Sequence, residues 1–331
     1  MYNMKFLVIG CGSIGSRHIL NIKKILPKSE IYAYDENKIQ RRKICKKFNV
    51  FEITKIPQDK SIFNLVLICT PPVSHISLAI SSIKDGANVF IEKPLSSNFK
   101  EISKLRNIIK KNSSLVFVGY NFRFNSGVNI IKKNIIEKKL GKVLFASAYF
   151  GQYLPDWRPK QNYKKNYSYN KKLGGGIVFD SSHEIDYLCW ILGNPISVQS
   201  NFVSGFSLKT DVEGLAEIIL KFKNNILANI HLDFIRSEYK RSMELLCENG
   251  IINWSLKEKE VKIFDRNKKL WKKIRINEDV NEMYVKEIKH VINCITNNKK
   301  SKIIDIENGI SILNFSESIM KSGKSGKRVK L

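Results

Sequence analysis

The feature that most constrains the fold is a glycine pattern near the N-terminus, Gly10-x-Gly12-x-x-Gly15. It follows an apolar run at 5–10, KFLVIG, which is typical of a buried strand, and it opens the segment 16–26, whose apolar residues recur at helical spacing. Between a strand and a helix, Gly10 permits a tight turn, Gly12 lets the backbone approach a pyrophosphate, and Gly15 allows close packing of helix on strand. The pattern predicts a dinucleotide-binding turn.

An acidic residue beyond the turn supports this prediction. Asp35 stands 20 residues after Gly15, at the end of the second apolar run, IYAYD at 31–35. Its carboxylate would accept hydrogen bonds from a ribose 2′-hydroxyl and repel a 2′-phosphate, which favours NAD over NADP as the cofactor. Arg41 and Arg42 keep NADP open, because either side chain could reach a 2′-phosphate.

Strands and helices alternate through the first third of the chain. The predicted strands at 31–35, 65–70, 87–92 and 115–120 alternate with helices at about 38–47, 73–84 and 102–111. Such alternation implies right-handed crossovers and a parallel sheet with helices on both faces. Later strand-like runs follow one another directly, at 142–150, 196–203, 213–222, 226–234, 242–249 and 261–265, with a hairpin turn at 223–225. The second half therefore predicts antiparallel pairing.

Composition excludes several classes of protein. The formal net charge of +27 suggests a nucleic-acid or membrane partner, but the lysines are spread along the chain and no base-reading motif occurs. We interpret the charge as a solvated, Lys- and Asn-rich surface or as a means of attracting an anionic substrate. No apolar run approaches the ~20 residues of a membrane span. Six scattered cysteines without a CxxC pair indicate a reducing compartment and no metal site. We expect a cytoplasmic protein with no specific nucleic-acid partner and no membrane contact.

Two further motifs end predicted buried strands, where parallel sheets of this kind bind ligands. CTPPVSH at 69–75 carries paired prolines, and IEKPLS at 91–96 holds Lys93 immediately before a proline. A lysine at a strand end is usually a solvated charge, but this one stands beside the predicted cofactor cleft. The predicted cofactor-binding residues are Gly10, Cys11, Gly12, Ser13, Ile14, Gly15, Asp35, Cys69, Thr70, Pro71, His75, Glu92, Lys93 and Asn121.

The motifs together resemble those of the Gfo/Idh/MocA oxidoreductases, a family that includes glucose–fructose oxidoreductase and inositol dehydrogenase. GCGSIG, Asp35, TPPVSH, EKPL, GYNFRF at 119–124 and GGGIVFDSSHEID at 174–186 stand in the family's order, and the tail SGKSGKRVKL is similar to its closing segment. The resemblance implies an α/β Rossmann NAD-binding domain at 1–122. It also implies an α+β substrate-binding and oligomerisation domain at 123–331, with an open, mostly antiparallel sheet. In the family a late helix, here about 280–297, packs back on the first domain, and the sheets pair into homodimers or homotetramers.

The resemblance also implies a reaction, in which a proton leaves a sugar hydroxyl and a hydride passes to nicotinamide. The family's catalytic lysine, histidine and aspartate map onto Lys93, His183 and Asp180. An imidazole accepts protons near neutrality, an ammonium stabilises a developing alkoxide, and a carboxylate holds the imidazole tautomer. Many family members space the pair as DxxxH, whereas here it is DxxH, which still fits one helix face. Asp180 is therefore either catalytic, a helix cap or an orienting acid, and Asp186 is either a substrate contact or a structural acid.

The segment 151–176 is a long loop rich in Trp, Tyr and Arg, typical of a functional loop or of a surface loop with packed aromatic residues. Arg158 suits a phosphate or carboxylate, and Trp157 and Tyr163 could stack on a sugar or a base. YLPDWRP resembles a subgroup associated with sugar-nucleotide biosynthesis. We predict substrate binding by Arg123, Trp157, Arg158, Tyr163 and Asp186. For His18, His231 and His290 we expect satisfied packing roles.

The leading interpretation is an NAD-dependent oxidoreductase acting on a hydroxyl or keto carbon of a sugar or nucleotide sugar, in surface-glycan or sugar biosynthesis. One alternative is a redox-neutral enzyme that retains NAD while it epimerises, eliminates or hydrolyses. Another is an NAD-binding sensor without catalysis. The presence of both Lys93 and His183 argues against the sensor.

Overall fold

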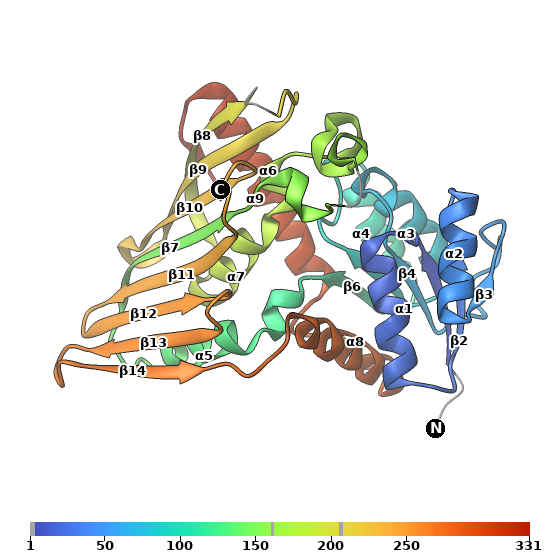
Figure 1. Ribbon diagram of the computed structural model, residues 1–331, viewed down its shortest axis with the longest axis horizontal. Helices are drawn as coiled ribbons and strands as arrows, with labels where there is room; N and C mark the ends of the chain where they lie inside the picture. Colours follow the sequence, from blue (N-terminus) through green and yellow to red (C-terminus); the bar gives the residue numbers. More distant parts are fainter. Residues whose placement is uncertain (1–3, 160–161, 205–207) are drawn as a thin grey trace. The chain divides into compact units, whose positions relative to one another are not determined.

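The computed structural model describes residues 4–159, 162–204 and 208–331. The chain divides into two compact units (Figure 1). Unit 1 runs up to Asn121 and includes Asn281–Ser311, whereas unit 2 consists of Phe122–Val280 and Ile312–Leu331. The chain therefore leaves unit 1 after Asn121, returns to it at Asn281 and leaves it again after Ser311.

Unit 1 is built on a six-stranded parallel sheet of order β3-β2-β1-β4-β5-β6. Its strands are β1 (Lys5–Ile9), β2 (Glu30–Tyr34), β3 (Phe51–Glu52), β4 (Leu65–Ile68), β5 (Val89–Glu92) and β6 (Val116–Gly119). Its helices are α1 (Ser13–Ile25), α2 (Lys38–Phe48), the 3-10 turn η1 (Pro72–Ser74), α3 (His75–Lys84) and α4 (Ile102–Lys111). The strand order reverses between β1 and β4, so a crevice for a ligand is expected beyond the carboxyl ends of these two strands.

The returning segment completes unit 1. The helix α8 (Val280–Thr296) places Tyr284 beneath the Arg17 guanidinium, 4.5 Å from the ring centroid, and the amide of Asn281 donates to Asn21 at 2.9 Å. Farther along, Ile304 accepts a hydrogen bond from the backbone N–H of Val118 at 3.2 Å, beside the strand β6. These contacts tie the late segment to the first helix and the last strand of the parallel sheet.

Unit 2 contains a nine-stranded sheet of order β14-β13-β12-β11-β7-β10-β9-β8-β15, in which only the pair β7–β10 is parallel among the described strands. The strands are β7 (Val143–Gly151), β8 (Pro195–Ser204), β9 (Glu213–Phe222), β10 (Leu227–Asp233), β11 (Lys240–Cys247), β12 (Gly250–Ser255), β13 (Glu260–Asp265), β14 (Leu270–Arg275) and β15 (Val329–Lys330). The helices α5 (Ser126–Ile136), α6 (Ile177–Asp180) and α7 (Ser182–Leu192) cover one face of this sheet (Figure 1). Alternate residues of β7, such as Ala146 and Ala148, are buried on that face.

The antiparallel hairpin predicted at 213–234 is present. β9 and β10 pair from Lys221↔Leu227 to Leu215↔Asp233, and Asn224 and Asn225 both adopt positive φ in the turn η7 (Lys223–Asn225). Four strands, β3, β12, β14 and β15, were not predicted, nor were the helices α5 and α9 (Ile306–Ser325). β14 has the sequence LWKKIR and lies exposed at one edge of the sheet. Its charged residues are common in edge strands but give no apolar pattern from which a strand could be predicted.

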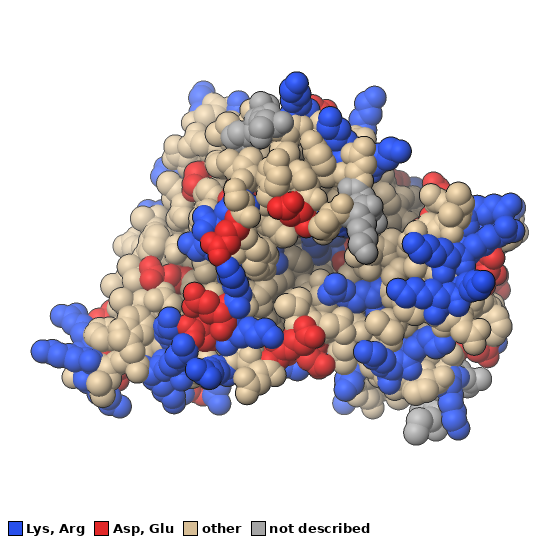
Figure 2. Space-filling model, in the orientation of Figure 1, with Lys and Arg blue, Asp and Glu red and all other residues tan. Residues whose placement is uncertain are grey.

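The positive charge is spread over the face of the molecule that Figure 2 shows. On the face that Figure 2 shows, Lys and Arg side chains are scattered, with Asp and Glu between them, rather than gathered into one patch. Within the described part of the chain, no helix is long and apolar enough to cross a lipid bilayer. The same residues contain no cluster of three or more His, Cys, Asp or Glu side chains that could hold a metal ion.

Candidate active site

The glycine turn of unit 1 has the geometry that its spacing predicts. Gly10 adopts a φ of +98°, and a Cβ there would lie 2.6 Å from the Cys69 carbonyl oxygen. A Cβ on Gly15 would lie 1.9 Å from the Gly10 oxygen, so the first turn of α1 needs glycine to approach β1. A Cβ on Gly12 would meet nothing within 4 Å. The open space at Gly12, next to the unpaired N–H groups at the start of α1, fits a pyrophosphate.

Asp35 and Arg41 fix the surroundings of this turn. Asp35 accepts hydrogen bonds from the backbone N–H of Cys11 at 2.7 Å and of Asn37 at 2.8 Å. A carboxylate has about four acceptor positions, so lone pairs remain for a ribose. Arg41, only 6% exposed, donates to the Asp35 carbonyl at 2.7 Å and to Glu52 at 2.9 Å. These two hydrogen bonds hold the Arg41 guanidinium within the fold. Of the two arginines considered for binding a 2′-phosphate, Arg41 is therefore already used by the protein itself.

Two buried histidines hold the EKP turn after β5. The Nε2 atom of His18 lies 2.7 Å from one oxygen of Glu92, whose other oxygen accepts the backbone N–H of Lys93 at 3.1 Å. His75 is 1% exposed, and its ring nitrogens lie 2.9 Å from the Pro94 oxygen and 2.8 Å from that of Thr70. Burial lowers the pKa of His75. Glu92 and His75 were predicted to bind the cofactor, but here both hold the loops that would surround it.

The remaining cofactor candidates fall into three groups by exposure. Gly12 and Ser13 are exposed at the start of α1, as is Pro71 after β4. The thiols of Cys11 and Cys69 are buried, and burial together with Asp35 raises the pKa of Cys11 to about 12, so neither is a reactive group. Ile14 and Thr70 are half-buried.

Asn121 lies two residues after β6 and is the last residue of the first stretch of unit 1. It is 1% exposed, and its Nδ2 atom has no hydrogen-bond partner among the described residues. A buried amide of this kind normally has a partner. With the open space at Gly12 and the free acceptor capacity of Asp35, the residues of unit 1 fit a bound dinucleotide.

In unit 2, Arg123 and Asp186 form a buried ion pair. The guanidinium Nη2 donates to Asp186 Oδ1 at 2.7 Å, and the two side chains are 3% and 0% exposed. Burial raises the pKa of Asp186, against the opposing effect of Arg123. Both residues were predicted to contact substrate; the structure instead places them in the interior, because each supplies the other's counter-charge. Of the two interpretations left open for Asp186, the geometry favours the structural acid.

The catalytic candidates of unit 2 stand on two helices rather than one. α6 ends at Asp180 and α7 begins at Ser182, because Ser181 between them has φ −100° and ψ 34°. The expectation of one shared helix face for Asp180 and His183 is therefore wrong. His183 is 6% exposed and its ring packs against Phe122, with centroids 4.9 Å apart. Its neighbour Glu184 pairs with Arg241 at 2.8 Å, so both acids of HEID are held by arginines.

The loop after β7 uses part of its aromatic surface for packing. The Trp157 ring meets Phe150 and Phe234 at centroid distances of 5.7 and 5.2 Å, and its Nε1 donates to the Gln152 oxygen at 3.2 Å. Arg158 donates to Asn166 at 3.4 Å. Tyr163 packs edge-on against Tyr169 at 5.6 Å. These three of the five predicted substrate residues lie in unit 2, and the Trp157 ring packs beneath the loop.

Two residues near Asp180 escaped prediction. Tyr167, in the 3-10 turn η5 (Tyr167–Tyr169), donates its hydroxyl to Asp180 Oδ1 at 2.5 Å. Glu213, at the start of β9, is 7% exposed and accepts the Val178 N–H at 3.3 Å. Burial raises the pKa of Glu213 to about 7. A signal for Tyr167 does exist in the sequence: asparagine recurs every fourth residue in NYKKNYSYNKK, at 162, 166 and 170.

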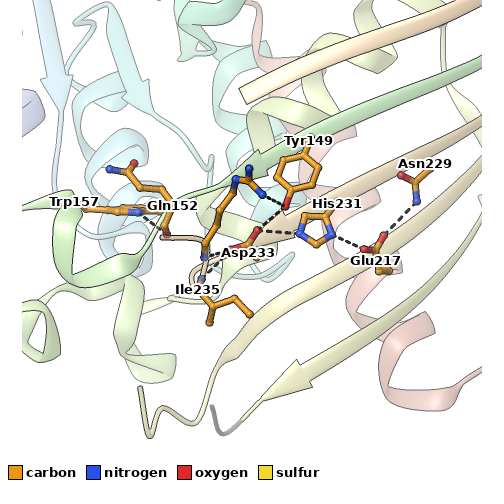
Figure 3. A network of polar contacts seen from close by, with 9 residues as sticks. Tyr149, Gln152, Trp157, Glu217, Asn229, His231, Asp233 and Ile235 are labelled. Carbon is orange, nitrogen blue, oxygen red and sulfur yellow. Dashed lines mark hydrogen bonds and ion pairs between the residues drawn. The ribbon is translucent and has the colours of Figure 1, made fainter. Parts of the chain in front are cut away.

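A polar network occupies the other face of the sheet in unit 2 (Figure 3). His231 bonds Glu217, lies 2.9 Å from Asp233, and stacks on Tyr149 with ring centroids 4.3 Å apart. Burial lowers the pKa of His231, but the hydrogen bonds to Asp233 and Glu217 outweigh it and leave the pKa raised. A groove of about 630 Å³ opens beside it and is lined by Tyr149 and Asn229 but by neither catalytic candidate of unit 2. The groove is therefore not the candidate active site.

Comparison with known proteins identifies the family. Residues 4–120 match the family model described as "Oxidoreductase family, NAD-binding Rossmann fold", and residues 128–253 match the "GFO/IDH/MocA C-terminal domain". The chain belongs to the Gfo/Idh/MocA family of NAD(P)-dependent oxidoreductases. The predictions of the fold class, of an NAD cofactor and of an oxidoreductase are thereby confirmed at the level of the family.

Individual relatives are distant. The chain is 24% identical to glucose-6-phosphate 3-dehydrogenase of Bacillus subtilis, over 68% of this chain and 66% of that protein. It is 28% identical to myo-inositol 2-dehydrogenase of Thermotoga maritima, over 69% of this chain and 67% of that protein. The matched stretches thus span about two thirds of these curated relatives. Levoglucosan dehydrogenase, solved with NADH and levoglucosan, superposes with a TM-score of 0.89 over 100% of this chain and 99% of that one, at 17% identity.

Proposed function

We propose that the protein is an NAD-dependent dehydrogenase that oxidises a hydroxyl group of a sugar or polyol. The observation that carries the proposal is the glycine turn of unit 1, where Gly10 and Gly15 are required by packing and the space at Gly12 is open. Family membership supports it, since the curated relatives include dehydrogenases of glucose 6-phosphate and myo-inositol.

Each candidate residue has a task that suits its chemistry. Bound NAD would supply the acceptor for the hydride that leaves the carbinol carbon. The imidazole of His183 would take the hydroxyl proton, and Asp180 would hold that imidazole in the accepting tautomer. The Lys93 ammonium would stabilise the negative charge that develops on the oxygen. Burial of Asp180 and His183, at 5% and 6% exposure, strengthens such electrostatic effects.

We further propose an anionic sugar or a nucleotide sugar as the substrate, within carbohydrate biosynthesis. Arg158 and Tyr163 on the loop after β7 support this choice, because a guanidinium binds phosphate and a phenol ring packs on a sugar or base. The net charge of +27 would help to attract an anion. We propose a homodimer or homotetramer, and a cytoplasmic location in keeping with six buried, unpaired cysteines.

The first test incubates the purified protein with NAD and a panel containing myo-inositol, glucose 6-phosphate, levoglucosan and UDP-linked sugars, and follows reduced nicotinamide by absorbance. A rise with any member supports the dehydrogenase. A flat trace with a chemically altered sugar, detected by mass analysis, would contradict it and support the redox-neutral enzyme. A flat trace with every compound unchanged would contradict oxidation of the sugars tested.

Substitutions test the assigned roles. Lys93→Ala and His183→Ala should abolish turnover, because the proton acceptor or the alkoxide-stabilising charge is lost. Binding of NAD, measured by calorimetry, should survive in His183→Ala. Near-normal rates in either variant would contradict the assignment.

A further inference from the structure

We propose that Tyr167 is a positioning residue for Asp180, so that the segment 162–173, here called the tyrosine loop, completes the candidate active site. The inference rests on the proposed function, in which Asp180 orients His183. It assigns a role in the reaction to a loop that the sequence connected only with substrate binding.

The contact itself is short and sheltered. The Tyr167 hydroxyl donates to Asp180 Oδ1 at 2.5 Å, and Asp180 is 5% exposed. A phenol O–H donates and a carboxylate oxygen accepts, so the two side chains are complementary hydrogen-bond partners. Because Asp180 is the last residue of the four-residue helix α6, its backbone is restrained by little helical structure. The phenol therefore supplies a restraint on the carboxylate that the helix does not.

The sequence builds the loop around this contact. The tyrosine loop consists of three successive 3-10 turns, η4 (Tyr163–Lys165), η5 and η6 (Lys171–Leu173). Each turn is capped by the asparagine before it: Asn162 accepts the Lys164 N–H at 3.0 Å, Asn166 accepts the Ser168 N–H at 3.5 Å, and Asn170 accepts the Lys172 N–H at 2.9 Å. The period of four residues thus fixes the turn that presents Tyr167.

The glycines before α6 hold the same turn. A Cβ on Gly175 would lie 2.2 Å from the Tyr167 carbonyl oxygen and 2.7 Å from that of Ser168. The Gly176 N–H donates to the Ser168 oxygen at 3.1 Å. Gly175 is therefore explained by close packing against the tyrosine loop, whereas a Cβ on Gly176 would meet the Glu213 carboxyl group at 2.2 Å.

A neighbouring tyrosine anchors the loop in a different way. The Tyr169 hydroxyl donates to the carbonyl oxygens of Leu208 at 3.1 Å and Lys209 at 2.6 Å, and its own carbonyl accepts the Thr210 hydroxyl at 3.0 Å. Tyr169 thus attaches the loop to a distant segment of unit 2 through backbone groups. It offers a matched control, since Tyr169→Phe removes a hydroxyl from the same loop without removing the bond to Asp180.

The test is a double-mutant cycle in the full-length protein, with NAD and the panel sugar that is oxidised fastest. Tyr167→Phe should lower kcat about tenfold or more, because it removes a hydrogen bond to a charged group, and it should leave the KM for NAD unchanged. In the Asp180→Asn background, Tyr167→Phe should cause no further loss, because its effect passes through Asp180. Tyr169→Phe, which loosens the attachment of the loop but keeps the bond to Asp180, should lower kcat less than Tyr167→Phe does. Gly175→Ala, which displaces the Tyr167 carbonyl, should reproduce the loss seen in Tyr167→Phe.

Two kinetic results would overturn the inference: wild-type kcat in Tyr167→Phe, or an equal loss in both backgrounds, which marks a structural role. If Asp180→Asn itself turns over normally, the role assigned to Asp180 fails, and the inference fails with it. If no panel sugar is oxidised, the dehydrogenase proposal fails separately, and the cycle is read from urea unfolding. A coupling between Tyr167→Phe and Asp180→Asn then supports the contact, and additivity overturns it.

Discussion

Glu213 provides a quantitative test of the packing around the glycine motif. Its side chain is 7% exposed, and burial raises its pKa from an ordinary value of 4.5 to about 7. The folded protein therefore holds this proton more tightly than the unfolded chain does. The resulting stabilisation is fully present below pH 4.5 and is lost as the pH rises through about 7. At about 1.4 kcal/mol per pKa unit, the difference between the two values corresponds to about 3 kcal/mol of unfolding free energy.

Glu213→Gln keeps the shape and the acceptor for Val178 but cannot ionise. Urea unfolding of both proteins, followed by circular dichroism from pH 4.5 to pH 8, isolates the effect because all other titrating groups are shared. We expect equal stabilities to within about 0.5 kcal/mol at pH 4.5, and a variant more stable than wild type by about 3 kcal/mol at pH 8. Parallel stability curves across this range would refute the reasoning, since they would mean that Glu213 does not hold its proton in the folded state.

Three further predictions concern the two units. Asp186→Asn should lower the unfolding free energy by about 3–5 kcal/mol, because it leaves the buried Arg123 without a counter-charge; unchanged stability with a raised substrate KM would mean that Asp186 contacts substrate instead. Gly15→Ala should destabilise the fold in urea, whereas Gly12→Ala should keep its stability and weaken NAD binding measured by calorimetry. Equal effects of the two alanines on NAD binding and stability would contradict their separate roles. Asp35→Asn should narrow the preference for NAD over NADP, measured as a ratio of dissociation constants, because it removes the charge that repels a 2′-phosphate; an unchanged ratio would show that another group sets the preference.

Features that depend on residues close together in the chain could be predicted from short sequence patterns. The glycine turn could be read from sequence because the requirement at Gly10, a positive φ, and at Gly15, contact with the Gly10 oxygen, arises within a few residues. The β9–β10 hairpin could also be predicted from the sequence, since Asn224 and Asn225 tolerate the left-handed backbone that the turn needs. In a parallel sheet, the residues after each strand necessarily gather at one edge, which made the TPP and EKP motifs interpretable as parts of one site.

The sequence alone did not predict which side chains pair with one another in the folded protein. Arg123 and Asp186 stand 63 residues apart, and both look like substrate ligands until the fold brings their charges together. Similarly, the sequence FDSSH does not predict that the helix is interrupted at Ser181, because serine is compatible with a continuing helix. Tyr167 was overlooked because a tyrosine in a polar loop gives no sign of the carboxylate it will meet, although the asparagine period marked the turn that carries it.

The discontinuity of unit 1 has a consequence for how the chain folds as it is made. During synthesis the ribosome releases the parallel strands and the glycine turn first, followed by eight of the nine strands of the sheet of unit 2, β7 to β14. Only then do α8 and Ile304, the partners of α1 and β6, emerge. A nascent chain that ends at Asn121 therefore has the cofactor motif but lacks the segment that packs against α1 and β6. We expect the nucleotide-binding unit, although it is the first to be translated, to reach its final stability only after most of unit 2 has been made.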